Sequence, residues 1–125
     1  FGKHFNNYLE ISSEILFVAQ IENIKAIENL DDILSVKELD AIMVGPYDLS
    51  GSMDLTGQFE HLQFLETMKI ISSKSQSHNI PMGLHVAQPD MKDLELKIAE
   101  GYQFIAYGID AVFLYQSAKR PVTLQ

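Results

Sequence analysis

The sequence predicts an α/β fold in which four strands alternate with four helices around one parallel sheet. Short apolar runs of strand length recur along the chain, and each is followed by a stretch whose apolar residues have helical spacing. Glycine, proline, asparagine and aspartate stand between these segments, where chain turns are expected. Alternation of strands and helices at this spacing is typical of a parallel sheet with right-handed crossovers.

The first half of the chain contains two of the predicted strands. Residues 15–21 form a continuous apolar run, which is typical of a strand covered on both faces. Asn23 is placed to cap a helix over residues 24–34, and a second strand follows at 40–44. Residues 45–58 contain three glycines and are predicted to be a long loop, which is often functional at this length. One face of the first helix is predicted to carry Ile27, Leu30 and Leu34.

The second half repeats the pattern. A helix is predicted over 59–77, followed by a strand at 82–86, and a further helix begins after the capping residue Asp90 and ends at Gly101. A fourth strand is predicted at 104–107 and a last helix at 111–119, with Asp110 as its cap. A short amphipathic helix is also expected near the start of the chain. The apolar residues predicted to pack are Phe5, Tyr8, Leu9, Phe64, Leu65, Met68, Ile71, Met91, Leu94 and Ile98.

Length and composition narrow the class of protein. The 125 residues are predicted to form a single domain, residues 1–125, with a real hydrophobic core. The formal net charge is −8 and no Lys/Arg cluster is present, so nucleic acid is not an expected partner. No apolar run approaches the ~20 residues of a membrane span. The absence of cysteine excludes disulfides and thiolate metal ligands, and a cytoplasmic location is expected.

Two carboxylates follow two of the predicted strands. Glu22 comes directly after the first strand, and Asp48 comes shortly after Gly45 and Pro46 end the second. In parallel α/β folds, ligands bind at the carboxyl ends of strands, and neighbouring strands lie ~4.8 Å apart. We therefore expect the two carboxylates to share one cation. Oxygen ligands with no Cys and no His pair favour a hard cation such as Mg²⁺ over zinc.

The segments Gln20-Ile21-Glu22 and Gly45-Pro46-Tyr47-Asp48-Leu49-Ser50 resemble the HpcH/HpaI aldolase family, also called the citrate-lyase β-like or 2-keto-3-deoxy acid aldolase family. Further similar segments occur in family order at 29–33, 40–42, 57–58 and 104–108. The resemblance implies a parallel (βα)₄ unit that is the carboxyl-terminal half of a TIM (β/α)₈ barrel of the phosphoenolpyruvate/pyruvate type. It also implies a lyase that cleaves or forms carbon–carbon bonds of pyruvate- or oxaloacetate-type 2-oxo acids.

The resemblance also implies roles for particular residues. Glu22 and Asp48 map onto the ligands of a divalent cation, Mg²⁺ or Mn²⁺, which binds the 2-oxo acid and stabilises its enolate. Gln20 maps onto a residue near the substrate. Gly45, Pro46 and Tyr47 map onto the substrate-binding segment, and the backbone N–H groups around Tyr47 and Asp48 map onto the contact with the substrate carboxylate.

The chain departs from the family pattern in two ways. It matches only the carboxyl half of the barrel, so the family's catalytic Arg and His on early strands have no counterpart, and Asp54 stands where glycine is common. An inactive half-barrel that serves as a binding or assembly module is therefore the alternative function. A flavodoxin-like open sheet is a third possibility. Open sheet edges predict a partner, either a second copy of the chain or a complementing N-terminal half-barrel.

Individual residues also have purely structural interpretations. Glu22 could occupy the first turn of the following helix, Asp48 could be a turn residue, and Gln20 could make a hydrogen bond in the core. Ser50 is interpreted as a turn residue. His85 is placed near the same ends of the strands, where contact with substrate and a structural role are both open. His61 and His78 are expected on helix surfaces.

Overall fold

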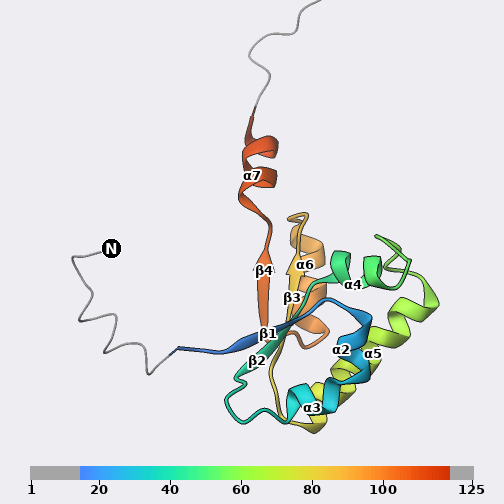
Figure 1. The fold of residues 1–125 in the computed structure, drawn as a ribbon. Helices are drawn as coiled ribbons and strands as arrows, with labels where there is room; N and C mark the ends of the chain where they lie inside the picture. The colour runs from blue at the N-terminus through green and yellow to red at the C-terminus, as the bar shows by residue number, and fades with distance from the viewer. Residues whose placement is uncertain (1–14, 119–125) are drawn as a thin grey trace, which may run out of the picture.

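The computed structural model describes residues 15–118. Its four strands form one parallel sheet in the order β1-β2-β3-β4, so the chain advances across the sheet one strand at a time (Figure 1). A (β/α)₈ barrel advances in this way, whereas a doubly wound sheet reverses its strand order at a switch point. The predicted parallel (βα)₄ unit is confirmed, and the flavodoxin-like alternative is wrong. The strands are β1 (Val18–Ile21), β2 (Ala41–Val44), β3 (Met82–Val86) and β4 (Phe104–Tyr107).

Helices follow every strand. In Figure 1, α2, α3 and α5 lie together beside the sheet, whereas α7 extends beyond the end of β4, away from the other helices. None of the helices within residues 15–118 combines the length and apolar character that crossing a bilayer requires. The helices are α2 (Ile24–Glu28), α3 (Leu30–Leu34), α4 (Pro46–Ser52), α5 (Leu62–Ser77), α6 (Met91–Ala99) and α7 (Asp110–Ser117).

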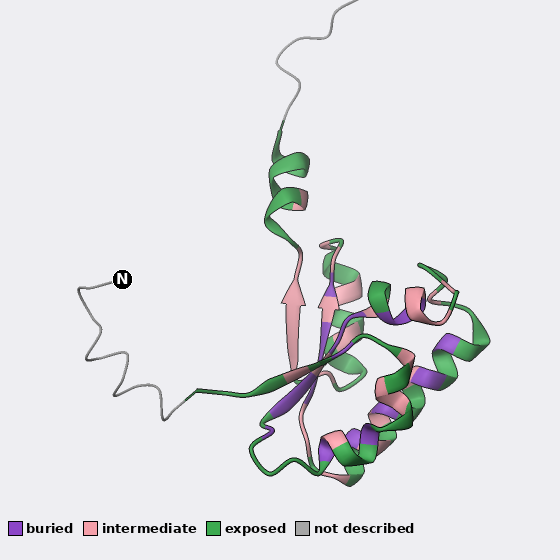
Figure 2. Cartoon of the chain, in the orientation of Figure 1, coloured by how far each residue is buried: buried purple, intermediate pink, exposed green. Residues whose placement is uncertain are grey.

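The two faces of the sheet differ in what covers them. Alternate strand residues point toward the helices and form the core, and the most deeply buried of these are Ile21, Ile42 and Val44. Helix α5 adds Phe64 and Ile71 to the same core. Figure 2 shows the buried residues concentrated on the strands and on the helix faces turned toward them. We call the opposite side of the sheet the inner face; in the strand register it carries Gln20, Met43, Gly83 and Phe104.

Helix ends follow the sequence closely. Asn23 accepts a hydrogen bond from Lys25 N (3.0 Å), and Asp90 accepts from Lys92 N (2.9 Å), so both predicted N-caps are confirmed. Gly101 ends α6 with a positive φ of 94°, as predicted. The backbone N–H groups of residues 101 and 102 donate to the carbonyls of Ile98 and Lys97, which is the Schellman pattern.

Some predicted boundaries are wrong. The helix predicted at 24–34 divides at Asn29 into α2 and α3, because Asn29 leaves helical geometry and its side chain donates to Lys25 O. Helix α5 begins at Leu62, with His61 as N-cap, instead of at residue 59. The predicted loop 45–58 contains α4, which begins at Pro46 because proline suits the first helical position. Asp110, which was predicted to cap α7, is instead its first residue, and the N-cap is Ile109.

The predictions at Phe5, Tyr8, Leu9 and Lys119 lie outside the described residues.

Other errors concern burial. The run 15–21 is not covered on both faces, since only residues 18–21 form a strand and Leu16 is 74% exposed. The predicted burial of Met91 and Ile98 on α6 is also wrong, because these side chains are 61% and 59% exposed. The cause is shared: β1 is one edge of the described sheet, and α7 does not pack beside α6. Both segments have apolar side chains, as the sequence shows, but no other described segment packs against those side chains.

Candidate functional site

The carboxyl ends of β1 and β2 bring Gln20, Glu22 and Gly45 together. Gly45 N donates to Ile21 O (3.1 Å), which extends the pairing of the two strands by one residue and sets Glu22 beside Gly45. A Cβ built on Gly45 would lie 3.1 Å from Gln20 Nε2 and 3.6 Å from Glu22 Oε2. The Gln20 and Glu22 side chains therefore lean over the Gly45 backbone. Gln20 is exposed, so the core hydrogen bond considered for it is not what the structure shows.

Asp48 lies in the first turn of α4, which starts directly after Gly45. Leu49 N donates to Gly45 O (2.9 Å), so the helix continues straight from the end of β2. Both Glu22 and Asp48 are exposed, and both lie at the carboxyl ends of adjacent parallel strands. The strand ends predicted to lie side by side do so. Asp48 is therefore not the turn residue of its structural interpretation but a residue in the first turn of a helix, where its charge interacts favourably with the helix dipole. Glu22 precedes α2 and is not in its first turn, so the structural interpretation offered for Glu22 is wrong.

Two serine hydroxyls hold α4 in place, and that of Ser52 joins it to the segment that carries Glu22. Ser52 Oγ accepts from Ile24 N (2.9 Å) and donates to Leu49 O (2.7 Å). Ser50 is fully buried; its hydroxyl donates to Tyr47 O (2.9 Å) and accepts from Gly57 N (3.1 Å). Ser50 was predicted to be a turn residue but lies within α4, and its hydroxyl joins the helix to the segment that follows it. Because Ile24 follows Glu22 by two residues, the Ser52 contact restrains the position of Asp48 relative to Glu22.

The donor set is suited to a hard cation. Among residues 15–118, no group of three or more His, Cys, Asp or Glu side chains gathers at one point, so Glu22 and Asp48 could supply only two protein ligands. Mg²⁺ and Mn²⁺ accept oxygen ligands, and Mg²⁺ commonly takes one or two carboxylates and completes its shell with water or substrate oxygens. The exposure of both carboxylates leaves room for those further ligands.

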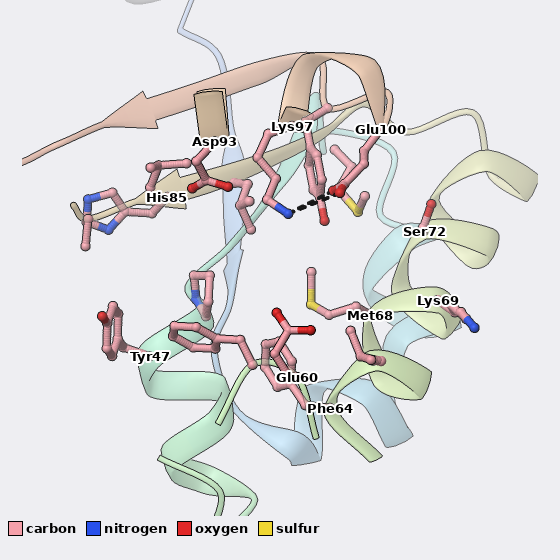
Figure 3. A pocket seen from close by; sticks show the side chains of 18 of the residues that line it. Tyr47, Glu60, Phe64, Met68, Lys69, Ser72, His85, Asp93, Lys97 and Glu100 are labelled. Carbon is pink, nitrogen blue, oxygen red and sulfur yellow. Dashed lines mark hydrogen bonds and ion pairs between the residues drawn. The ribbon is translucent and has the colours of Figure 1, made fainter. Parts of the chain in front are cut away.

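A pocket that the sequence did not reveal lies on the helix side of the sheet, and neither Glu22 nor Asp48 belongs to its lining. It measures about 550 Å³, lies between α5 and α6, and includes Pro46, Tyr47 and His85 in its lining. Figure 3 shows Tyr47 and His85 at one end of the pocket and Lys69 and Ser72 at the other. The Tyr47 ring is held edge-on against Phe59, with ring centroids 4.9 Å apart. The only local signal in the sequence is the polar spacing of Asp93, Lys97 and Glu100 along one side of a helix.

A polar cluster at the carboxyl end of α6 forms another part of the pocket lining. Lys97 Nζ lies 3.0 Å from Glu100 Oε2, and the Tyr102 side chain is half-buried nearby. Burial raises the pKa of the Tyr102 phenol to about 12, with a further contribution from the negative charge of Glu100. The phenol is therefore neutral and able to donate a hydrogen bond throughout the physiological range.

The three described histidines have different surroundings. His61 caps α5, where its Nδ1 accepts from Gln63 N (3.3 Å), and His78 Nε2 lies 3.3 Å from Asp31 Oδ1. Both are at helix ends, in agreement with the surface positions predicted for them. His85 is different, because it is half-buried near the carboxyl end of β3 with Nε2 3.3 Å from Gly108 O.

Comparison with known proteins identifies the class to which this fold and these motifs belong. Residues 6–117 match the family described as HpcH/HpaI aldolase/citrate lyase. The chain therefore belongs to the HpcH/HpaI aldolase/citrate lyase family, whose members include aldolases and lyases, and the resemblance noted in the sequence is confirmed.

Individual relatives agree with this assignment. A 2-keto-3-deoxy-L-rhamnonate aldolase of Shigella dysenteriae is 28% identical over 117 residues, which are 94% of this chain and 43% of the relative. The crystal structure of an HpcH/HpaI aldolase from Desulfitobacterium hafniense superposes with a TM-score of 0.75 at 29% identity, over 90% of this chain and 43% of that one. Citrate synthase SbnG gives a TM-score of 0.73 at 26% identity, over 89% and 45% of the two chains.

The relatives are more than twice as long as the segment that matches them, so the four βα units correspond to part of a longer fold. The chain spans less than half the length of the relatives it matches. Its sheet is the four-stranded half of a TIM-type barrel, as the resemblance implied.

Proposed function

We propose that this chain carries the metal- and substrate-binding half of a lyase active site that acts on pyruvate- or oxaloacetate-type 2-oxo acids. The observation that carries the proposal is the approach of Gln20 and Glu22 to the Gly45 backbone, directly before the helix that presents Asp48. Family membership supports carbon–carbon bond cleavage or formation as the reaction class.

In this proposal each residue has a defined task. Glu22 and Asp48 bind a divalent cation, Mg²⁺ or Mn²⁺, through carboxylate oxygens. When bound, the cation supplies positive charge beside the 2-oxo oxygen. Gln20 positions the substrate from β1. Gly45, Pro46 and Tyr47 form the substrate-binding segment at the start of α4, and the backbone N–H groups around Tyr47 and Asp48 hold the substrate carboxylate. The missing side chain at Gly45 permits close approach.

The proposed enzyme also needs a partner for its open edges. Apolar side chains are exposed at both ends of the described chain, with Leu16 74% exposed near β1, and Leu114 and Tyr115 74% and 82% exposed on α7. Apolar surface of this kind favours association. We propose that a second copy or a complementing N-terminal half-barrel covers these surfaces. Of the two, the N-terminal half-barrel would also supply the family's catalytic Arg and His.

Metal binding tests the role of the two carboxylates. Titration of the full chain with Mn²⁺ in the presence of oxalate, followed by the loss of the free-ion EPR signal, should show binding that Glu22→Ala and Asp48→Ala each weaken by at least about tenfold. The matched control is Glu28→Ala, which removes an exposed carboxylate from α2 and should leave the affinity unchanged. Equal affinities of the wild type and Glu22→Ala would reject the proposed ligand set.

The second candidate is an inactive half-barrel that serves as a binding or assembly module. The observation that favours it is the small number of candidate metal ligands, because no group of three or more His, Cys, Asp or Glu side chains gathers within residues 15–118. Exchange of the pyruvate methyl protons in D₂O separates the candidates, because an enolate-forming site exchanges these protons without any acceptor substrate. Exchange above background in the wild type that is lost in Asp48→Ala would rule out the inactive module.

A further inference from the structure

The two edges of the described sheet, β1 and β4, lack the usual protection of free strand edges. Among residues 15–118, each of these strands pairs with one neighbour only. Natural proteins usually protect a free edge with charged side chains or proline. The edge segments 15–21 and 104–107 contain neither, and Leu16 is 74% exposed. Both edges are therefore suited to pair with further strands.

Hydrogen bonds show which backbone groups of β1 face its open edge. In a parallel strand, the N–H and C=O of one residue point toward one neighbour, and those of the next residue point toward the other. Ile21 O accepts from Gly45 N (3.1 Å), and Phe17 O accepts from Ala41 N (3.4 Å). The odd-numbered residues of this segment thus face β2, and the N–H and C=O of Val18 point to the open edge.

The outward-facing groups of β4 are found in the same way. Gly108 N donates to Val86 O (2.7 Å), and Val86 is the register partner of Tyr107. In a parallel pair, a residue that faces the neighbouring strand bonds to the residues on either side of its register partner. The backbone of Tyr107 therefore points away from β3, and by alternation the backbone of Ile105 does the same.

A two-fold axis would fix how these two edges meet. The strand register leads across the sheet from Ile21 to Ile105. Around a closed eight-stranded barrel of this type the register shifts by about eight residues, so each half contributes a shift of about four. Ile105 would therefore meet residue 17 or residue 25 of a second copy. Lys25 lies in α2, which leaves Phe17 as the partner.

The backbone groups of the two edges match in this register. With Phe17 opposite Ile105, Val18 lies opposite the residue between Ile105 and Tyr107. Val18 N–H would then donate to Ile105 O, and Tyr107 N–H would donate to Val18 O, as in the ladder of any parallel pair. All four groups belong to the outward-facing sets, so the pairing disturbs no hydrogen bond within either copy.

The side chains of the two edges match in the same register. Continued alternation along β1 places Leu16 and Val18 on the inner face, which also carries Phe104. Leu16 would lie beside Phe104, and Val18 would lie beside Ala106. Leu16 and Val18 are 74% and 40% exposed in the described chain, and the pairing would cover both with apolar neighbours.

We infer that a second copy of this chain closes the barrel, with β1 of each copy paired in parallel with β4 of the other. One copy supplies both kinds of edge, so the same contact forms twice and no edge stays open. The two-fold axis runs along the barrel, which places both copies of Glu22 and Asp48 at the same end. The inference goes beyond the proposed function, because it depends on strand edges and not on metal or substrate.

Sedimentation of matched variants tests the closure on the full chain. The wild type should sediment at micromolar concentration as a dimer of twice 14.1 kDa. Leu16→Lys places a charge in the new pairing and should weaken the dimer by at least about tenfold. Leu62→Lys is the control on α5, where Leu62 is 68% exposed, and it should leave the dimer unchanged. The circular dichroism of Leu16→Lys should match that of the wild type, because Leu16 contacts little within one copy.

Amide hydrogen exchange shows which surface forms the dimer. The N–H groups of Val18 and Tyr107 should exchange at least about tenfold more slowly in the wild-type dimer than in Leu16→Lys. Gly45 N–H is bonded to Ile21 O within one copy, so its exchange rate should be alike in both proteins.

Three outcomes would overturn the closure. The first is a wild type that stays monomeric. The second is a dimer that Leu16→Lys leaves intact or that leaves the Val18 amide unprotected, which would move the contact to another surface such as α7. The third is a chain that is monomeric alone but binds a separately produced amino-terminal half of the Desulfitobacterium relative, which would assign the edges to that half. A dimer with these properties that binds no metal would overturn the proposed function alone.

Discussion

Gly83 on β3 lies directly against the ring of Phe104 on β4. The two residues are register partners, and a Cβ built on Gly83 would lie 2.3 Å from Phe104 Cζ. Phe104 therefore covers the inner face of β3 through the space that glycine leaves. We conclude that the inner face of the half-barrel is packed tightly at β3.

Gly83→Ala should consequently destabilise the fold. The methyl group must displace an aromatic ring in contact with the backbone, and overpacking of this kind costs about 1–3 kcal/mol. Urea unfolding followed by circular dichroism measures the change in the free energy of unfolding. Gly51→Ala is the matched control, because a Cβ there meets only Thr56 Oγ1 at 3.6 Å and a helical alanine is favourable. A Gly83→Ala protein as stable as Gly51→Ala would contradict the observed packing.

Asp54→Gly should stabilise the chain by about 1 kcal/mol. Asp54 has a positive φ of 59°, and the N–H groups of Asp54 and Leu55 donate to Gly51 O and Ser50 O, the Schellman pattern at the end of α4. Glycine suits this position because it has no Cβ to clash, which explains the family preference noted in the sequence. Thermal unfolding measures the effect, and Asp54→Val should lower the melting temperature. A lower melting temperature for Asp54→Gly would show that the aspartate side chain itself stabilises the turn.

The ionisation of Asp31 should make a surface contact dependent on pH. The hydrogen bond from Lys74 Nζ (2.7 Å) lowers the pKa of the Asp31 carboxyl below 3.8, and the His78 contact acts in the same direction. Because the folded-state pKa is lowered, the stabilisation is present above pH 3.8 and is lost as the pH falls through the folded-state value. Carbon-13 NMR of the carboxyl measures this pKa directly.

The matched variant for this contact is Lys74→Met, which should move the Asp31 pKa up toward the ordinary value, whereas Lys69→Met on the same helix should leave it unchanged. High salt should also raise the pKa of the Asp31 carboxyl toward its ordinary value, because salt screens the interaction between exposed charges. An Asp31 pKa that does not respond to Lys74→Met would rule out the ion pair between α3 and α5 in solution.

Association should bury the exposed apolar residues of α7. Sedimentation of the full chain at micromolar concentration is expected to show species larger than a monomer, because Leu114 and Tyr115 are 74% and 82% exposed on a helix that extends away from the other helices. Leu114→Asp combined with Tyr115→Asp should shift the distribution toward monomer. Gln116→Asp adds a charge to the same helix without removing apolar surface and serves as control. A wild-type protein that sediments only as monomer would contradict the expected partner surface.

Much of the fold follows from local sequence. The strand bounds at 82–86 and 104–107 and the caps at Asn23 and Asp90 agree with the structure, because strand propensity and capping depend on residues within one or two turns of the chain. The prediction of a loop after Gly45 was wrong because it relied on the three glycines of this segment. The proline and the aspartate at the start of α4 were the correct signal, since both favour the first turn of a helix. The burial predicted for the apolar face of α6 was wrong because burial depends on a neighbouring segment, and the local sequence does not show whether such a segment is present.

Part of the candidate site could likewise be predicted from the sequence, and part could not. Glu22 and Asp48 were recognisable because each follows a strand and belongs to a family motif, and the order of the strands then places their segments side by side. The pocket between α5 and α6, and the orientation of His85 by Gly108, join residues that are far apart in the chain.

The sequence by itself determined the α/β alternation, the family and the residues that mark the strand ends, because these depend on short-range chemistry and contiguous motifs. Only the tertiary structure decided which apolar faces are covered and that Gly45 lies beneath Gln20 and Glu22. These relationships depend on register between strands and on packing between distant segments, and no single stretch of the chain encodes them.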